Sequence, residues 1–66
     1  DLALALERLD PRDRELIELR YARGLRVGEV AHVLGVSRFS AGRMIRSALD
    51  ALRKELGPSD QEGSNS

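Results

Sequence analysis

Apolar residues recur every three or four positions along most of the chain, with polar residues between them. In the first segment Leu2, Leu6 and Leu9 follow this spacing, which places their side chains on one face of an α-helix. No segment shows the residue-by-residue alternation expected of a half-buried strand. The pattern therefore predicts a short amphipathic helix over residues 1–9.

A second helix is predicted between Asp10-Pro11 and Gly24. Asp10 suits the N-cap, and Pro11 suits the first helical position, where its missing N–H costs nothing. Gly24 suits a left-handed cap at the other end. The side chains expected on the inner face of this helix are Leu16, Ile17 and Tyr21.

The sequence "VGEVAHVL" at residues 27–34 predicts a third, shorter helix. It follows Arg26, whose side chain makes a poor N-cap, and it ends at Gly35, a residue suited to helix termination. The apolar face expected for this helix consists of Val27, Val30, Ala31 and Leu34.

Ser37 is a strong N-cap for a fourth helix, predicted over residues 38–56. Phe39, the only phenylalanine of the chain, falls on its polar side and is expected to point away from the core. The apolar stripe of this helix is formed by Ala41, Met44, Ile45, Ala48, Leu49, Leu52 and Leu56. The opposite side carries Phe39, Arg43, Arg46, Ser47 and Asp50.

A short helix, a turn that begins with glycine and a longer capped helix form a helix-turn-helix arrangement. The expected fold class is therefore all-α, a small four-helix domain over residues 1–57. Residues 58–66, "PSDQEGSNS", carry no large apolar side chain and predict a disordered tail. Because the chain begins at Asp1 within a helical pattern, we expect it to be part of a longer protein.

Composition excludes several classes of function. The chain has 66 residues and no cysteine, so we expect a single small domain in a reducing, cytoplasmic setting. Its longest apolar run, "LALAL", is too short to span a bilayer. The only histidine, His32, lies on the exposed side of the third helix, and no glycine-rich phosphate loop is present. We therefore expect no enzyme activity, no cofactor, no metal and no membrane partner.

The net charge of zero hides an uneven distribution. Residues 1–36 hold seven acidic and six basic side chains, whereas residues 37–57 hold two and five. No acid is spaced to pair with Arg43 or Arg46 before Asp50, four positions after Arg46. Such arginines can reach phosphates or guanine edges from the start of a helix whose free N–H groups also attract phosphate. This clustering favours binding to nucleic acid.

Phe39 stands among these arginines, and three interpretations remain open. Its ring could pack on a thymine methyl group in the major groove. It could enter a pocket of a protein partner. It could also be an ordinary exposed apolar residue, since such residues are common on protein surfaces.

The sequence resembles region 4 of bacterial RNA polymerase sigma factors, most closely the alternative factors of the stress, sporulation and flagellar type. The similar pieces are "LDPRDRELIELRY", "GLRVGEVAHVLGVS" and "ALDALRKEL", within residues 6–56 and without a gap. The resemblance implies that the fourth helix recognises the promoter −35 element. It also implies docking on the β flap of RNA polymerase and contact with an anti-sigma factor or an activator.

By position, the resemblance implies a set of DNA-contacting residues at the start of the fourth helix. Further along, Arg53 and Lys54 match a basic segment that in this family meets upstream DNA or an activator. The DNA-contacting residues are Ser37, Arg38, Phe39, Ser40, Gly42, Arg43, Arg46 and Ser47.

Three positions depart from the family pattern. Arg26 replaces the usual Ser or Thr cap, Ala41 replaces a β-branched residue, and Gly42 stands inside a helix at a cost of about 1 kcal/mol relative to Ala. Close approach of the helix backbone to DNA or to a partner would explain Gly42. Two alternatives therefore stand beside promoter recognition. One is a LuxR-type activator domain, although "RFSAGRM" lacks the threonine–valine–basic pattern of that group. The other is a protein-interaction module that uses Phe39, Gly42 and a hydrophobic groove of the first three helices.

Overall fold

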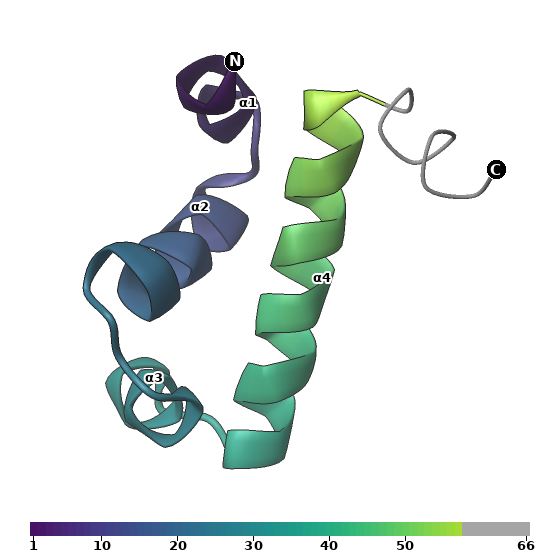
Figure 1. The fold of residues 1–66 in the computed structure, drawn as a ribbon. Helices are drawn as coiled ribbons and strands as arrows, with labels where there is room; N and C mark the ends of the chain where they lie inside the picture. Colours follow the sequence, from purple (N-terminus) through teal and green to yellow (C-terminus); the bar gives the residue numbers. More distant parts are fainter. Residues whose placement is uncertain (58–66) are drawn as a thin grey trace, which may run out of the picture.

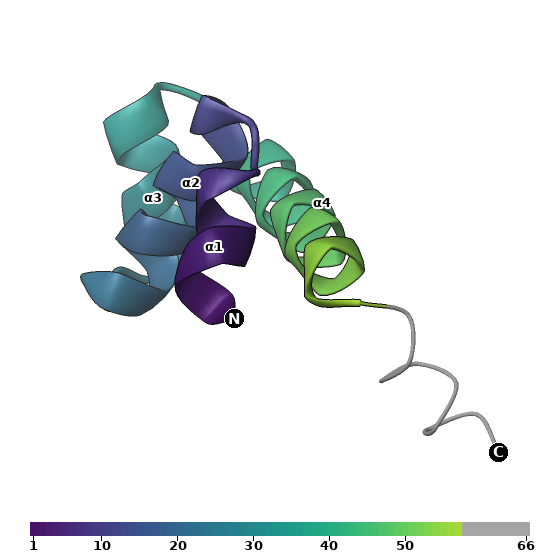
Figure 2. The same cartoon turned by 90° about the horizontal axis from the view of Figure 1, so that it is seen from above.

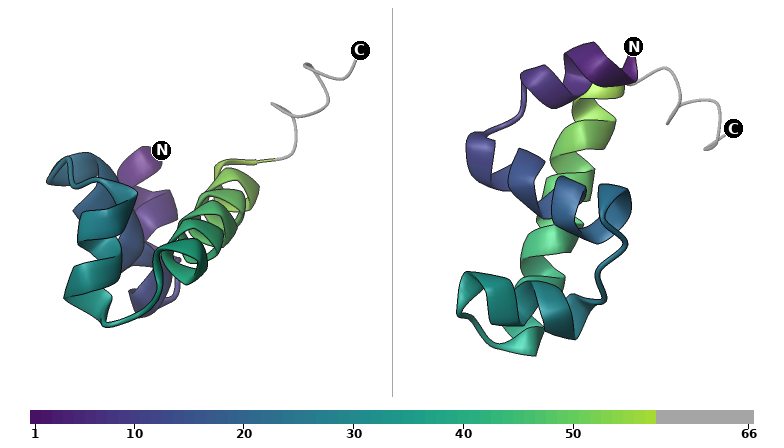
Figure 3. Two further views of the ribbon diagram at one scale, coloured as in Figure 1. Left: turned by 90° about the horizontal axis from the view of Figure 1, so that it is seen from below. Right: turned by 90° about the vertical axis from the view of Figure 1, so that its left-hand side faces the viewer.

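Short helical elements cross one side of a long helix in the computed structural model, which describes residues 1–57 (Figure 1). Viewed from that side, α1, α2 and α3 follow one another along α4, from its C-terminal to its N-terminal end (Figure 3). Viewed from above, the short helices lie together on one side of α4 (Figure 2). The elements are α1 (Leu2–Glu7), α2 (Pro11–Ile17), η1 (Glu18–Ala22), α3 (Val27–Leu34) and α4 (Arg38–Leu56). The described residues are thus all-α, as predicted, while the expected tail at residues 58–66 lies outside them.

α1 is shorter than the sequence pattern predicts. It ends at Glu7, and the carboxylate of Asp1 caps it by accepting a hydrogen bond of 3.1 Å from the N–H of Ala3. Leu9 is buried in the turn that follows, as its apolar character suggests. Leu2 is 55% exposed, contrary to the prediction of an inner position, because it lies in the first turn at the chain end.

The second predicted helix begins as an α-helix and ends as a π-helix. Leu16 and Ile17 are buried as expected, but from Glu18 the backbone continues as the π-helix η1, closed by a hydrogen bond of 2.9 Å from the Arg23 N–H to the Glu18 carbonyl. A π turn takes in one residue more than an α turn, so the side chains within it are displaced around the axis. Tyr21 is 54% exposed as a result, and its predicted inner position was wrong.

The turn between α3 and α4 has the predicted geometry. Gly35 adopts φ 72° and ψ 34°, the left-handed conformation that glycine reaches without steric cost. The Val36 N–H bonds the Ala31 carbonyl at 3.0 Å and the Gly35 N–H bonds the His32 carbonyl at 3.3 Å, which together form a Schellman motif. These bonds terminate α3 and direct the chain into α4.

The two helices of the motif are capped differently. The Ser37 hydroxyl accepts a hydrogen bond of 3.0 Å from the Ser40 N–H, as predicted for α4. Arg26 makes no side-chain cap bond at the start of α3, because a guanidinium group has no acceptor. Instead the Glu29 carboxylate accepts a bond of 2.7 Å from the Arg26 N–H. One half of a capping box therefore replaces the missing serine or threonine.

The core lies between α4 and the three short helices. Two residues of the α4 stripe, Ala41 and Ala48, are fully buried; their small side chains allow close helix packing. Leu56 is 42% exposed, so its predicted place in the buried stripe was wrong; it is the last residue of α4. The main buried cluster consists of Leu9, Leu16, Ile17, Val30, Ile45 and Ala48.

Candidate nucleic-acid interface

The predicted DNA-contacting residues lie on the first three turns of α4 and at its cap. The capped start leaves free backbone N–H groups at the positive end of the helix dipole. Ser40 and Gly42 are half-buried. The exposed members of the set are Ser37, Arg38, Phe39, Arg43, Arg46 and Ser47.

A shallow depression lies between the starts of α3 and α4. We call it the basic hollow; its volume is about 580 Å³, and its lining residues are Val27, Arg38, Phe39, Gly42, Arg43 and Arg46. A Cβ added to Gly28 would lie 3.9 Å from Nε of Arg38, so this guanidinium stem lies close to the first turn of α3. The fold thus brings three arginines of one helix to the start of another.

The arginines of the basic hollow carry uncompensated charge. Within residues 1–57 the one salt bridge joins Arg53 to Asp50, with Nη1 3.6 Å from Oδ1. Asp50, the acid that the spacing offers to Arg46, is therefore engaged elsewhere. Among residues 1–57 no acid pairs with Arg38, Arg43 or Arg46, so within this range their guanidinium N–H groups remain available for an anion, which is the electrostatic requirement of a phosphate-binding surface.

Phe39 projects from this surface as predicted. Its side chain is 75% exposed, the largest exposed fraction among the exposed large hydrophobic residues. The guanidinium carbon of Arg43 lies 5.4 Å from the centroid of its ring, within the range of a cation–π interaction. The two side chains, one helical turn apart, therefore contact each other and form a joint apolar and cationic surface.

Arg53 and Lys54 are exposed near the other end of α4. Ten residues separate Arg53 from Arg43, which is about 15 Å along a helix axis. They therefore do not belong to the basic hollow.

The fold itself does not require glycine at position 42. A Cβ added there would lie 3.9 Å from Cγ1 of Val27, an ordinary van der Waals distance. The close approach that would explain Gly42 is therefore not found inside the domain. Val27 itself was missed as a site residue, because helical periodicity assigned it to the core and cannot show that its side chain also reaches the surface.

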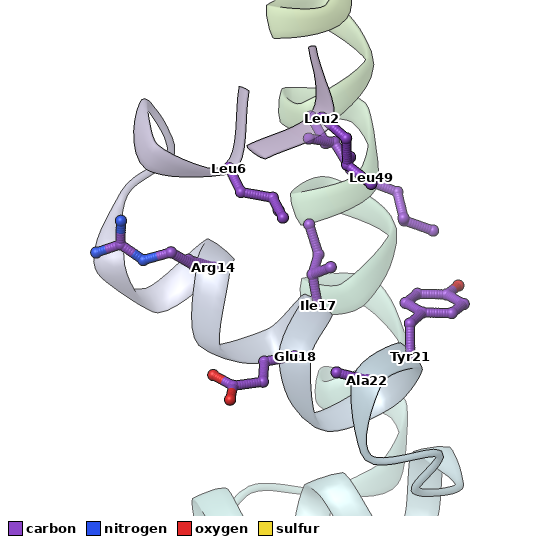
Figure 4. Close-up of a pocket in the computed structure, with 9 residues that line it drawn as sticks. Leu2, Leu6, Arg14, Ile17, Glu18, Tyr21, Ala22 and Leu49 are labelled. Carbon is purple, nitrogen blue, oxygen red and sulfur yellow. The ribbon is translucent and has the colours of Figure 1, made fainter. Parts of the chain in front are cut away.

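A second depression, the apolar groove, lies between α1, α2, η1 and the C-terminal half of α4 (Figure 4). Leu6 and Ile17 point into it, Leu2 lies beside Leu49, and the charged ends of Arg14 and Glu18 point outward (Figure 4). Its volume is about 620 Å³, and its lining residues are Leu2, Leu6, Arg14, Ile17, Glu18, Tyr21, Ala22, Leu49 and Leu52. The sequence predicted a groove of the first three helices; α3 contributes none of these residues and α4 replaces it.

Residues 1–57 contain neither a membrane-spanning helix nor a metal-binding cluster. No helix there has the length and apolar character needed to cross a bilayer. No group of three His, Asp or Glu side chains in this range is arranged to hold a metal ion.

Comparison with known proteins agrees with this geometry. No curated protein and no solved structure matches the chain significantly. A family model, described as Sigma-70, region 4, matches residues 5–54. That range includes the end of α1, the whole helix-turn-helix and nearly all of α4, so the LuxR-type alternative is set aside. The chain belongs to the region 4 family of sigma factors, whose members are DNA-binding helix-turn-helix domains of the transcription machinery.

Proposed function

We propose that this domain recognises the −35 element of a promoter by inserting the first turns of α4 into the major groove. The observation that carries the proposal is the basic hollow, where Arg38, Arg43 and Arg46 have no acidic partner among the described residues. Ser37 fixes the helix start that faces the phosphates. The short helix α3 lies across the duplex backbone and braces α4.

The available charge limits how tightly the isolated domain binds. Three to five basic side chains, counting Arg53 and Lys54, provide about half of the ~6–10 phosphate contacts of an independent binder. One recognition helix also buries only about 600–1,000 Å². We therefore expect an affinity near the non-specific range, raised in the cell by tethering to RNA polymerase.

The test is a titration of labelled duplexes that carry candidate −35 sequences. Arg43→Ala should weaken the preferred duplex by about 1–3 kcal/mol and reduce the preference for it. Arg12→Ala is the matched control, since Arg12 is exposed on α2 and outside the basic hollow. Equal losses in the two variants would contradict the proposal, because they would show that only net charge matters.

We further propose that the apolar groove receives a helix of the polymerase β flap. Leu2 and Tyr21 line it and are 55% and 54% exposed, an arrangement typical of surfaces that bury an amphipathic helix. An anti-sigma factor would act by occupying the same groove, while Arg53 and Lys54 remain free to meet upstream DNA or an activator. A promoter-binding domain of this kind would work in the cytoplasm.

Calorimetric titration with a purified flap fragment tests this second proposal. Binding should show a negative heat-capacity change and little dependence on salt, because the buried surface is apolar. Arg43→Ala should leave it unchanged. Binding that weakens steeply with salt, or that depends on Arg43, would place the flap contact elsewhere.

A further inference from the structure

Phe39 is the exposed large apolar side chain of the basic hollow, and phosphate binding does not explain it. Exposed Leu2 and Tyr21 line the apolar groove, whereas Phe39 stands among arginines on the DNA-facing helix. A ring that is 75% exposed contributes little to the core, and its neighbour Arg43 contacts it rather than covering it from solvent. The ring therefore offers apolar surface where the proposed ligand is a polyanion.

The geometry points to a specificity role: Phe39 and Arg43 together recognise a thymine next to a guanine, the ring resting on the thymine methyl and the guanidinium bonding the guanine edge. This inference rests on the proposed function, since it names the base step that the same surface selects.

The chemistry of the ring selects the thymine methyl. A phenyl group has no hydrogen-bond donor or acceptor, so it cannot distinguish the polar groups on base edges. In the major groove the C5 methyl of thymine is the apolar group that distinguishes one base pair from another. Phe39 lies in the first turn of α4, the part of a recognition helix that reaches base edges. Its complement in the groove is therefore this methyl group.

The guanidinium of Arg43 selects guanine, and its contact with Phe39 sets the spacing between the guanine and the thymine. Arginine bonds O6 and N7 of guanine with two N–H groups, and no acid of the described residues occupies those of Arg43. Contact with the ring at 5.4 Å restricts the rotamers of Arg43 before DNA arrives, so less side-chain entropy is lost on binding. Because the two side chains touch, we place the groups they contact in neighbouring base pairs, which are about 3.4 Å apart.

Modified bases test each contact separately. The wild-type chain, residues 1–66, first selects duplexes from a randomised pool at low salt. In the selected duplex, uracil then replaces thymine, which removes the methyl and keeps the pairing. We expect the wild type to bind the uracil duplex about 4-fold more weakly, the value of one buried methyl. Phe39→Ala should bind both duplexes equally.

The guanine contact has a parallel test. Replacing guanine by 7-deazaguanine removes the N7 acceptor, and we expect about 5-fold weaker binding by the wild type and no change for Arg43→Ala. Phe39→Ala should keep the wild-type melting temperature because its ring is exposed, so any change in its DNA binding is not a folding effect.

Three results would overturn the inference, and they differ from one another. Equal wild-type binding to thymine and uracil duplexes would exclude methyl recognition while leaving promoter binding intact. Loss of polymerase binding in Phe39→Ala, without any effect on DNA, would make the ring a protein contact. Failure of the wild type to select any duplex would overturn both the inference and the proposed function.

Discussion

The basic hollow and the apolar groove are similar in size and opposite in chemistry. They measure about 580 and 620 Å³, and α4 contributes to both, the hollow at its start and the groove in its C-terminal half. Arginines line the first and mainly leucine, isoleucine and alanine line the second. One helix thus carries a cationic surface and an apolar surface, and we expect mutation to separate the two proposed contacts.

The difference arises from what covers each part of α4. At its start, Ala41 is fully buried, and the polar side faces outward with arginines that no acid of the described residues pairs. Further along, Leu49 and Leu52 are only half-buried, because α1, α2 and η1 leave a groove beside them. The same apolar stripe is closed by packing at one end and left open at the other.

The largest effect that we expect comes from destabilising the core, because it supports both the basic hollow and the apolar groove. Leu16 is 1% exposed, and Leu16→Ala should cost about 2–5 kcal/mol through lost burial and a residual cavity. Urea unfolding measures this loss. Leu2→Ala is the control: its side chain is 55% exposed, and its stability should change by no more than about 0.5 kcal/mol. Equal losses would show that the Leu2 side chain belongs to the core.

Tyr21→Ala should weaken polymerase docking and leave DNA binding intact. Its ring lines the apolar groove and is exposed by the π-helix, so truncation should weaken polymerase docking by about 1–2 kcal/mol. Affinity for the selected duplex should not change. Calorimetry with the flap fragment measures docking, and anisotropy with labelled DNA measures DNA affinity. Phe39→Ala should show the reverse pattern, with weaker DNA binding and unchanged docking. Weaker DNA binding by Tyr21→Ala would show that the apolar groove and the basic hollow do not act independently.

Ser37→Ala should destabilise the start of α4, which carries the basic hollow, and should leave the apolar groove unaffected. The Ser37 hydroxyl caps α4 through the Ser40 N–H, and losing such a cap costs about 1 kcal/mol of folding stability. A thermal melt detects the loss, and flap binding by the folded protein should stay the same. Ser47→Ala is the control on the same helix, because Ser47 is exposed and caps nothing. A melt equal to wild type would mean that solvent replaces the cap bond.

Gly42→Ala should give the smallest change, with opposite signs for stability and DNA binding. The added Cβ fits 3.9 Å from Val27, and alanine favours the helix by about 0.5–1 kcal/mol. The melting temperature should rise, and DNA affinity should fall because the methyl enters the basic hollow. Higher stability with unchanged affinity would show that DNA does not approach the α4 backbone at this residue.

Local signals in the sequence were sufficient for the helix-turn-helix. The start and end of α4, the Ser37 cap and the left-handed Gly35 were predicted correctly, because each depends on residues within one or two turns. The outward position of Phe39 also followed from the periodicity of a regular α-helix. The family resemblance then placed the candidate DNA contacts on that helix start, and their binding roles stay predictions.

Only the tertiary structure decided which apolar side chains are covered. A uniform helical period placed Tyr21 inside, but the π-helix η1 turned it outward. The same period could not show that Leu2 and Leu56 lie at ends with too little cover, or that Val27 reaches the basic hollow. The pairing of Asp50 with Arg53 rather than Arg46 was equally hidden. Capping and turns are settled by neighbouring residues, whereas burial depends on which segments meet, and the spacing of residues along one segment does not contain that information.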